Sequence, residues 1–244
     1  KNWADREDLI PQISNLNSKL PNINFNIGGR SGGYWMDGLA GKKIDRPTIL
    51  INGEKTASVD FPCSHLNLCY RHETGSWYQQ ETYQELKAEG REYEDGYIVS
   101  TKIDRGLTKQ MIQLMFNVKS KSAVSKLFNE WLLKDGNEEH NYNKLNSGYE
   151  TIEIQEEILK HHYKIKDYFY KGTIAGQVIQ WEEANLMFNI ADQYIQEHNV
   201  TALTIHDELI IQEQHQPLAK EFMFSSGHND ICSKYSLMDK IKGM

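Results

Sequence analysis

The stretch TALTIHDELII (Thr201–Ile211) places one histidine and two acidic residues between two apolar runs. The residues on both sides are of types that favour β-strands, and the polar residues between them suit a tight turn. We therefore predict a hairpin with His206 and Asp207 at its tip. The turn has two interpretations. One is a plain charged turn, where aspartate is common; the other is a turn whose carboxylates bind a metal ion.

A second hairpin is predicted in RPTILINGEKTASVDF (Arg46–Phe61). Its Asn-Gly pair at 52–53 is a strong signal for a two-residue turn, and the alternating run that follows ends at Asp60. If this strand lies beside the first hairpin, the carboxylates of Asp60 and Asp207 converge. Two like charges about 4 Å apart repel by roughly 4 kcal/mol at an effective dielectric of 20. Such a pair therefore needs a proton or a metal ion between its members.

The clearest helical stretch is RGLTKQMIQLMFN (Arg105–Asn117), whose apolar residues recur at helical spacing. A different face carries four polar residues spaced four apart, which are Arg105, Lys109, Gln113 and Asn117. Two cations and two amides in a row suit a triphosphate and the edge of a base. The alternative interpretation is a solvated basic face.

The bulk composition excludes several classes of protein. The chain has 244 residues, of which 39% are apolar and 25% charged, so we expect a folded protein rather than a disordered one. No apolar run approaches the roughly 18 residues of a membrane helix, so we expect no membrane partner. The three cysteines are an odd number without a CxxC pair, which argues against a disulfide framework and predicts a cytoplasmic protein. The net charge of −7 argues against a general nucleic-acid coat protein, although residues 102–126 are basic. The sequence begins with Lys rather than Met, which suggests a fragment or a processed product.

The remaining pattern alternates strands and helices irregularly, which predicts the α+β class. Residues 135–148 form a polar connector and the best candidate boundary. We expect His161 and His162 to form a partly exposed helix end, and the aromatic residues in 163–170 to be core. Further helices are expected at Ser64–His72, Tyr78–Glu89, Thr151–His162, Gln180–His198 and Pro217–Phe224, with a tail or short helix at the end of the chain.

In order and spacing, these motifs resemble those of family A DNA polymerases and the related single-subunit RNA polymerases of phages and mitochondria. VDFPCSHL (Val59–Leu66) is similar to motif A of that superfamily, RGLTKQMIQLMFN to motif B, and IHDEL (Ile205–Leu209) to motif C. GGRSGGY (Gly28–Tyr34) resembles the arginine-containing segment that precedes motif A. The resemblance covers about residues 24–224 and is confined to the motifs.

The resemblance implies a nucleotidyltransferase that uses two Mg²⁺ ions, or Mn²⁺ in their place, to add nucleotides to a primer 3′-hydroxyl. It assigns Asp60, Asp207 and the backbone carbonyl of Phe61 to the metals, with Glu208 assisting, and Arg105 and Lys109 to the triphosphate, with Lys109 also a proton donor to pyrophosphate. It further assigns Gln113, Asn117 and His65 to the nucleotide, and Arg30 and His206 to the nucleic acid.

The architecture that the resemblance implies is a palm, made of an antiparallel sheet with helices, and a helical fingers subdomain without an evident thumb. We expect a first palm part at 1–75, fingers at 76–148 and a second palm part at 149–244. The partners would be a primer–template of DNA, or of RNA, a nucleoside triphosphate and a replication or processivity factor. The compact layout suggests a phage, plasmid or other mobile element, and hence a bacterial or phage-infected cell.

Two departures from the family pattern leave alternatives open. Asn117 and Val118 stand where the motif B helix normally ends in Tyr-Gly. His65 stands at the sugar-selecting position, where the DNA enzymes carry Glu and the RNA enzymes Gly, so the choice between dNTP and NTP is open. The alternatives are a catalytically degenerate nucleic-acid-binding replication module, an RNA polymerase or primase-like enzyme, a metal-dependent nuclease, and a plain α+β module for protein–protein interaction.

Overall fold

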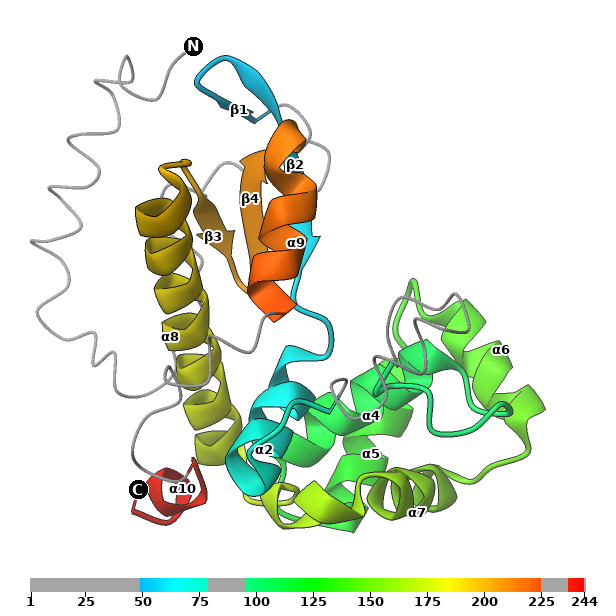
Figure 1. Cartoon of the computed structure of the whole chain (residues 1–244). Coiled ribbons are helices and arrows are strands. Elements are labelled where there is room, and N and C mark those ends of the chain that lie inside the picture. The colour runs from blue at the N-terminus through cyan, green and yellow to red at the C-terminus, as the bar shows by residue number, and fades with distance from the viewer. Residues whose placement is uncertain (1–48, 79–94, 225–236, 244) are drawn as a thin grey trace, which may run out of the picture. The chain divides into compact units, whose positions relative to one another are not determined.

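The computed structural model describes residues 49–78, 95–224 and 237–243, which fall into two compact units (Figure 1). The described residues of the first unit are 49–61 and 180–224. Those of the second unit are 62–78, 95–179 and 237–243. The chain passes from the second unit to the first within one long helix, α8 (Thr173–His198).

The first unit contains a four-stranded antiparallel sheet in the order β1-β2-β4-β3. Its strands are β1 (Leu50–Ile51), β2 (Glu54–Asp60), β3 (Leu203–Ile205) and β4 (Glu208–Gln212). Both predicted hairpins are confirmed. Asn52 and Gly53 form the first turn with φ of 55° and 81°, the left-handed values that a two-residue hairpin turn favours.

Apolar side chains hold this sheet on both faces. The three central residues of β4 are consecutive and all buried, so β4 lies inside the unit rather than at its surface. One cluster on the sheet joins Ile49, Ile51, Ile205 and Ile210. Helix α9 (Gln216–Phe224) packs on β2 and β4, reached through a short 3₁₀ turn, η5 (Glu213–His215).

The described part of the second unit is helical. Its elements are α2 (Ser64–Thr74), α4 (Arg105–Asn117), α5 (Lys121–Leu132), α6 (Glu138–Ser147), α7 (Thr151–His161), the 3₁₀ helix η4 (Tyr163–Tyr168) and α10 (Leu237–Gly243). Helix α4 packs against α5 and α7, and its side chains Met111 and Phe116 are fully buried. The Asp104 carboxylate caps α4 by accepting hydrogen bonds from two backbone N–H groups of its first turn.

The structure confirms the α+β class and the helix at 105–117, and it differs from the sequence prediction in two places. Residues 138–147 of the expected connector form α6, and α8 begins at Thr173 rather than at residue 180. The two units meet at 61/62 and 179/180, because α7 and η4 pack with α2, α4 and α5. Most of the predicted helix at 78–89 lies outside the described residues. None of the described helices has the length and apolar character needed to cross a membrane.

His161 at the end of α7 is half-buried, as predicted, whereas His162 is more buried than predicted. His162 is completely buried; its Nε2 lies 2.8 Å from the carbonyl oxygen of Gly96, and its Nδ1 lies 3.1 Å from the hydroxyl of Tyr70. The imidazole therefore donates from Nε2 and accepts at Nδ1, which is the neutral form. Burial is the main cause that lowers the pKa of His162 to about 4. Among the aromatic residues in 163–170, Tyr168 and Phe169 are core residues as predicted, whereas Tyr163 is exposed and Tyr170 is half-buried.

The depressed pKa of His162 predicts a loss of stability in acid. The unfolded histidine takes up a proton near pH 6.5 and the folded one only near pH 4, so the free energy of unfolding falls between these values and changes no further below them. The full loss from this group is about 3 kcal/mol. Chemical denaturation from pH 7 to pH 4 should therefore show a flatter pH dependence for His162→Gln than for the unchanged chain. His215→Gln, at a half-buried surface position, is the control and should keep the slope; parallel curves for all three proteins would contradict the assignment.

Candidate active site

The end of β2 places two carboxylates opposite each other on neighbouring strands. The register pairs Asp60 with Glu208, and the backbone N–H of Phe61 donates to the carbonyl oxygen of Asp207 over 2.7 Å. That hydrogen bond makes Asp60 and Glu208 a non-hydrogen-bonded pair, whose Cα atoms are about 4.5 Å apart in antiparallel sheets and whose side chains share one face. Asp60 is exposed and Glu208 half-buried, so both carboxylates lie at the surface end of the sheet.

Asp207 occupies the second position of the turn between β3 and β4, directly opposite Phe61. His206 occupies the first position with φ of 54°, a left-handed value that is costly for a residue with a Cβ. The turn thus places Asp207 next to the Asp60–Glu208 pair along the backbone. The resemblance implied only an assisting role for Glu208, whereas the register makes it the direct neighbour of Asp60.

These carboxylates have the chemistry that hard divalent cations require. Mg²⁺ and Mn²⁺ bind oxygen ligands, and Mg²⁺ sites typically use one or two carboxylates together with water and substrate phosphates. Asp60 and Glu208 supply two carboxylates from rigid strand ends, and Asp207 follows on the turn. No set of three or more His, Cys, Asp or Glu side chains within the described ranges is grouped to hold a metal ion on its own.

The basic face of α4 lies in the second unit and is organised by a segment that the sequence did not single out. The guanidinium of Arg105 lies 5.2 Å from the ring centre of Tyr97, and the ammonium nitrogen of Lys109 lies 5.8 Å from the same ring. Arg105 also forms an ion pair with Asp95 through its Nε. The structure therefore brings the two predicted triphosphate-binding cations together, on one aromatic side chain.

The two amides further along α4 lie deeper in the second unit. Asn117 donates from its side chain to the carbonyl oxygen of Gln113 over 2.8 Å, and its own carbonyl oxygen accepts from the Thr173 hydroxyl over 3.4 Å. The side chain also fills the space beside Gly176, where a Cβ would come within 1.9 Å of Oδ1. Asn117 thus serves packing between α4 and α8 in this structure, while Gln113 is half-buried on the same face as Arg105 and Lys109.

The residues after Asp60 enter the second unit. Cys63 precedes α2 with φ of 51°, and its thiol donates to Oδ1 of Asp95 over 3.5 Å. Burial, reinforced by the Asp95 charge, raises the pKa of Cys63 to about 12, so the thiol stays protonated and is no nucleophile at neutral pH. His65 is buried on α2 with its ring edge-to-face against Phe116 of α4, 6.2 Å between ring centres.

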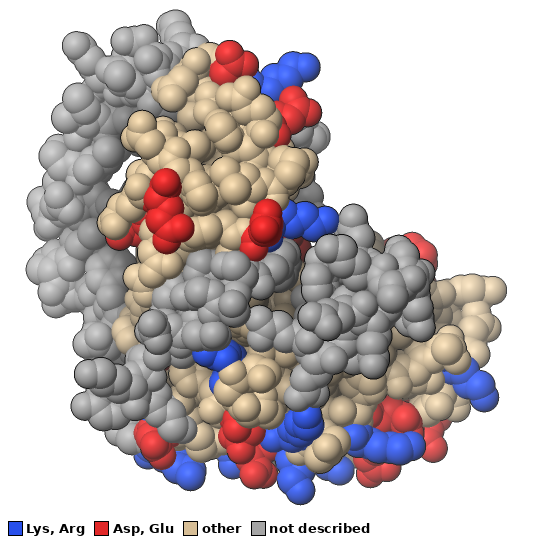
Figure 2. All heavy atoms as spheres, viewed as in Figure 1, with Lys and Arg blue, Asp and Glu red and all other residues tan. Residues whose placement is uncertain are grey.

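Charge on the described surface is mixed rather than of one sign. On the face in view, blue and red side chains are interspersed over the helical unit (Figure 2). Within the basic region predicted at 102–126, Lys121 pairs with Glu156 at 3.6 Å and Lys126 with Glu130 at 3.9 Å. Exposed pairs of this kind contribute little stability, but they reduce the local positive field.

Comparisons of the chain with protein-family models, with curated proteins and with solved structures gave no match. The arrangement of its own residues therefore carries the functional argument. Arg30, the remaining residue assigned to nucleic acid, lies outside the described residues. The structure adds two residues to the candidate site, Asp95 and Tyr97. Both lie in a loop, and no periodic pattern in the sequence pointed to them.

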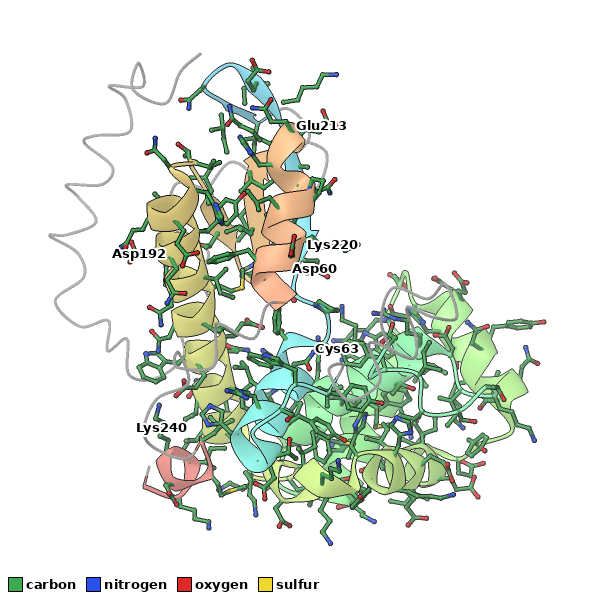
Figure 3. All side chains as sticks on the ribbon, in the orientation of Figure 1. Asp60, Cys63, Asp192, Glu213, Lys220 and Lys240 are labelled. Atoms are coloured by element: carbon green, nitrogen blue, oxygen red, sulfur yellow. The ribbon has the colours of Figure 1, made fainter. Side chains whose placement is uncertain are left out.

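If Asp60 and Glu208 bind a divalent cation, removal of one carboxylate should weaken that binding at least about tenfold. Glu208→Gln keeps the shape of the side chain and removes its charge. Its matched control is Glu213→Gln, since Glu213 follows the opposite end of β4 and lies far from Asp60 along the sheet (Figure 3). Free Mn²⁺ measured by electron paramagnetic resonance during a titration gives the affinity; equal affinities for Glu208→Gln and Glu213→Gln would contradict a site at the Asp60 end.

Proposed function

We propose that this chain is a template-directed nucleotidyltransferase, similar to family A DNA polymerases, which adds nucleotides to a primer 3′-hydroxyl. The observation that carries the proposal is the register of β2 and β4, which pairs Asp60 with Glu208 and places Asp207 on the adjoining turn. A cluster of carboxylates at strand ends is what a metal-dependent phosphoryl transfer needs. The basic face of α4, with Arg105 and Lys109 four residues apart, supplies the second requirement.

In this mechanism Asp60 and Glu208, with Asp207 on the adjoining turn, would hold Mg²⁺. Bound there, Mg²⁺ lowers the pKa of a hydroxyl and offsets charge on phosphate oxygens. Arg105 and Lys109 bind the phosphate oxygens and stabilise the negative charge that grows on the departing pyrophosphate. Lys109 also carries a proton that it can donate to that leaving group, since an ammonium is a general acid.

The finer parts of the proposal concern the nucleic acid and the sugar. His206, at the tip of the turn beside Asp207, is our candidate for the contact with the primer terminus. His65 is the candidate for sugar selection. Its side chain is buried where α2 meets α4, with the ring against Phe116, so a sugar would have to approach it at that contact. The substrate is therefore a nucleoside triphosphate of either sugar, and the partner is a primer–template.

Primer extension with Mg²⁺, run separately with dNTPs and with NTPs, tests the proposal. We expect extension by the unchanged chain, and we expect Asp60→Asn and Asp207→Asn to abolish it. Lys109→Ala should lower the rate on the order of 10²–10³-fold, the usual loss when one charge-stabilising donor is removed. Lys109 is exposed, so this substitution tests function without disturbing the core. Glu213→Gln should leave the rate unchanged.

Two results would replace the proposal with another function. Binding of primer–template without extension by either nucleotide would indicate a catalytically degenerate binding module. Strand cleavage with Mg²⁺, abolished by Asp60→Asn but unaffected by Lys109→Ala, would indicate a nuclease, because a nuclease needs no triphosphate site.

A further inference from the structure

We infer that Tyr97 is the positioning residue of a polyphosphate-binding site formed by Arg105 and Lys109; the inference rests on the proposed function for the identity of the substrate. Both cations lie within 6 Å of the centre of this one ring, at 5.2 Å and 5.8 Å. Distances of this size are those at which a ring face attracts a cation. The ring therefore gathers two charges that would otherwise repel each other.

The ring is itself held by buried contacts. Gly96, the residue before it, accepts a hydrogen bond from Nε2 of the buried His162 over 2.8 Å. A Cβ at Gly96 would come within 3.0 Å of the Leu66 side chain, so the segment lies directly on α2. The backbone N–H of Tyr97 donates to Oδ1 of Asp95 over 2.9 Å. These contacts fix the backbone that leads into the ring, and Tyr97 as a whole is only 7% exposed.

Asp95 sets the orientation of one cation. Its Oδ1 accepts from the Tyr97 N–H and the Cys63 thiol, while its Oδ2 accepts from Nε of Arg105. The carboxylate thus binds the Nε edge of the guanidinium, and the Arg105 side chain is still 49% exposed. The two terminal nitrogens of a guanidinium are the ones that grip phosphate in a fork.

Pre-organisation explains why the ring matters for binding. Arginine and lysine side chains lose much rotamer freedom when they are fixed by a ligand. Side chains already held over a ring lose less of it on binding, so the same contacts give a higher affinity. Among the charged groups that the described residues bring to this ring, two cations stand against one carboxylate, that of Asp95, and this positive excess favours an anion with several charges. A triphosphate has that chemistry.

Binding of Mg²⁺-tripolyphosphate to the full chain, measured by isothermal titration calorimetry, tests the inference without requiring catalysis. The comparison is between Tyr97→Phe and Tyr97→ring-fluorinated phenylalanine, which have nearly the same shape but differ in the negative potential of the ring face. Fluorination should weaken binding about fivefold, the equivalent of one cation–π contact. The same pair of substitutions at Tyr142, an exposed position on α6, is the matched control and should change nothing.

A second set of variants distinguishes a positioning role of Tyr97 from a purely structural one. In a background that carries Arg105→Ala and Lys109→Ala, fluorination at Tyr97 should have no effect on the remaining binding. Equal affinity of the two Tyr97 variants, or a fluorination effect that persists without the cations, overturns the inference. Primer extension by a chain that does not bind tripolyphosphate also overturns it while leaving the proposed function intact. Tripolyphosphate binding that depends on Tyr97, in a chain that extends no primer, supports the inference and removes the proposed function.

Discussion

The antiparallel pairing of β2 with β4 is the interaction on which the carboxylate site depends. It joins segments about 150 residues apart in the chain, and its register decides which side chains share a face. The neighbouring rung pairs Val59 with Leu209, and both are buried. A slip of β4 by one residue would separate Val59 from Leu209 and place Asp60 and Glu208 on opposite faces of the sheet. Apolar burial therefore fixes the position of the acidic pair, although no acidic residue contributes to that burial.

The second unit relies on a different kind of support. Its cations lie on long side chains at the start of α4, where Asp104 caps the helix and Arg105 follows at the first position. The loop at 95–97 holds them, and His162 holds the loop through the carbonyl oxygen of Gly96. The neutral imidazole donates to Gly96 and accepts from Tyr70, so one buried side chain joins the loop to α2.

Local signals account for what the sequence predicted correctly. The Asn-Gly turn, the polar tip at 206–207 and the apolar period of α4 each act within a few residues, and all three elements are present. Helix α6 was not predicted because none of its residues is buried, so its sequence has no apolar stripe. It carries Glu138 and Glu139 in its first turn and Lys144 in its last, which favour a helix through its dipole instead.

The parts that could not be predicted are long-range. Glu208 precedes the apolar run of β4, and only the register shows that it, rather than Asp207, faces Asp60. His162 follows an amphipathic helix and had the pattern of an exposed end; its burial comes from α2 and the loop at 95–97. Both are consequences of contacts between segments 66 to about 150 residues apart, for which a single sequence holds no periodic signal.

The carboxylates at the strand ends and the cations of α4 also differ in how the protein fixes their positions. The carboxylates are attached by short side chains to strand ends, so the hydrogen-bonded backbone alone sets their position. Arginine and lysine have several rotatable bonds, so a rigid helix does not by itself place their charges. The structure meets this second requirement with side chains, namely an aromatic ring beneath two cations and a carboxylate at the edge of one. Short acidic residues on strands and supported basic residues on a helix are thus two physical solutions to the same need for fixed charge.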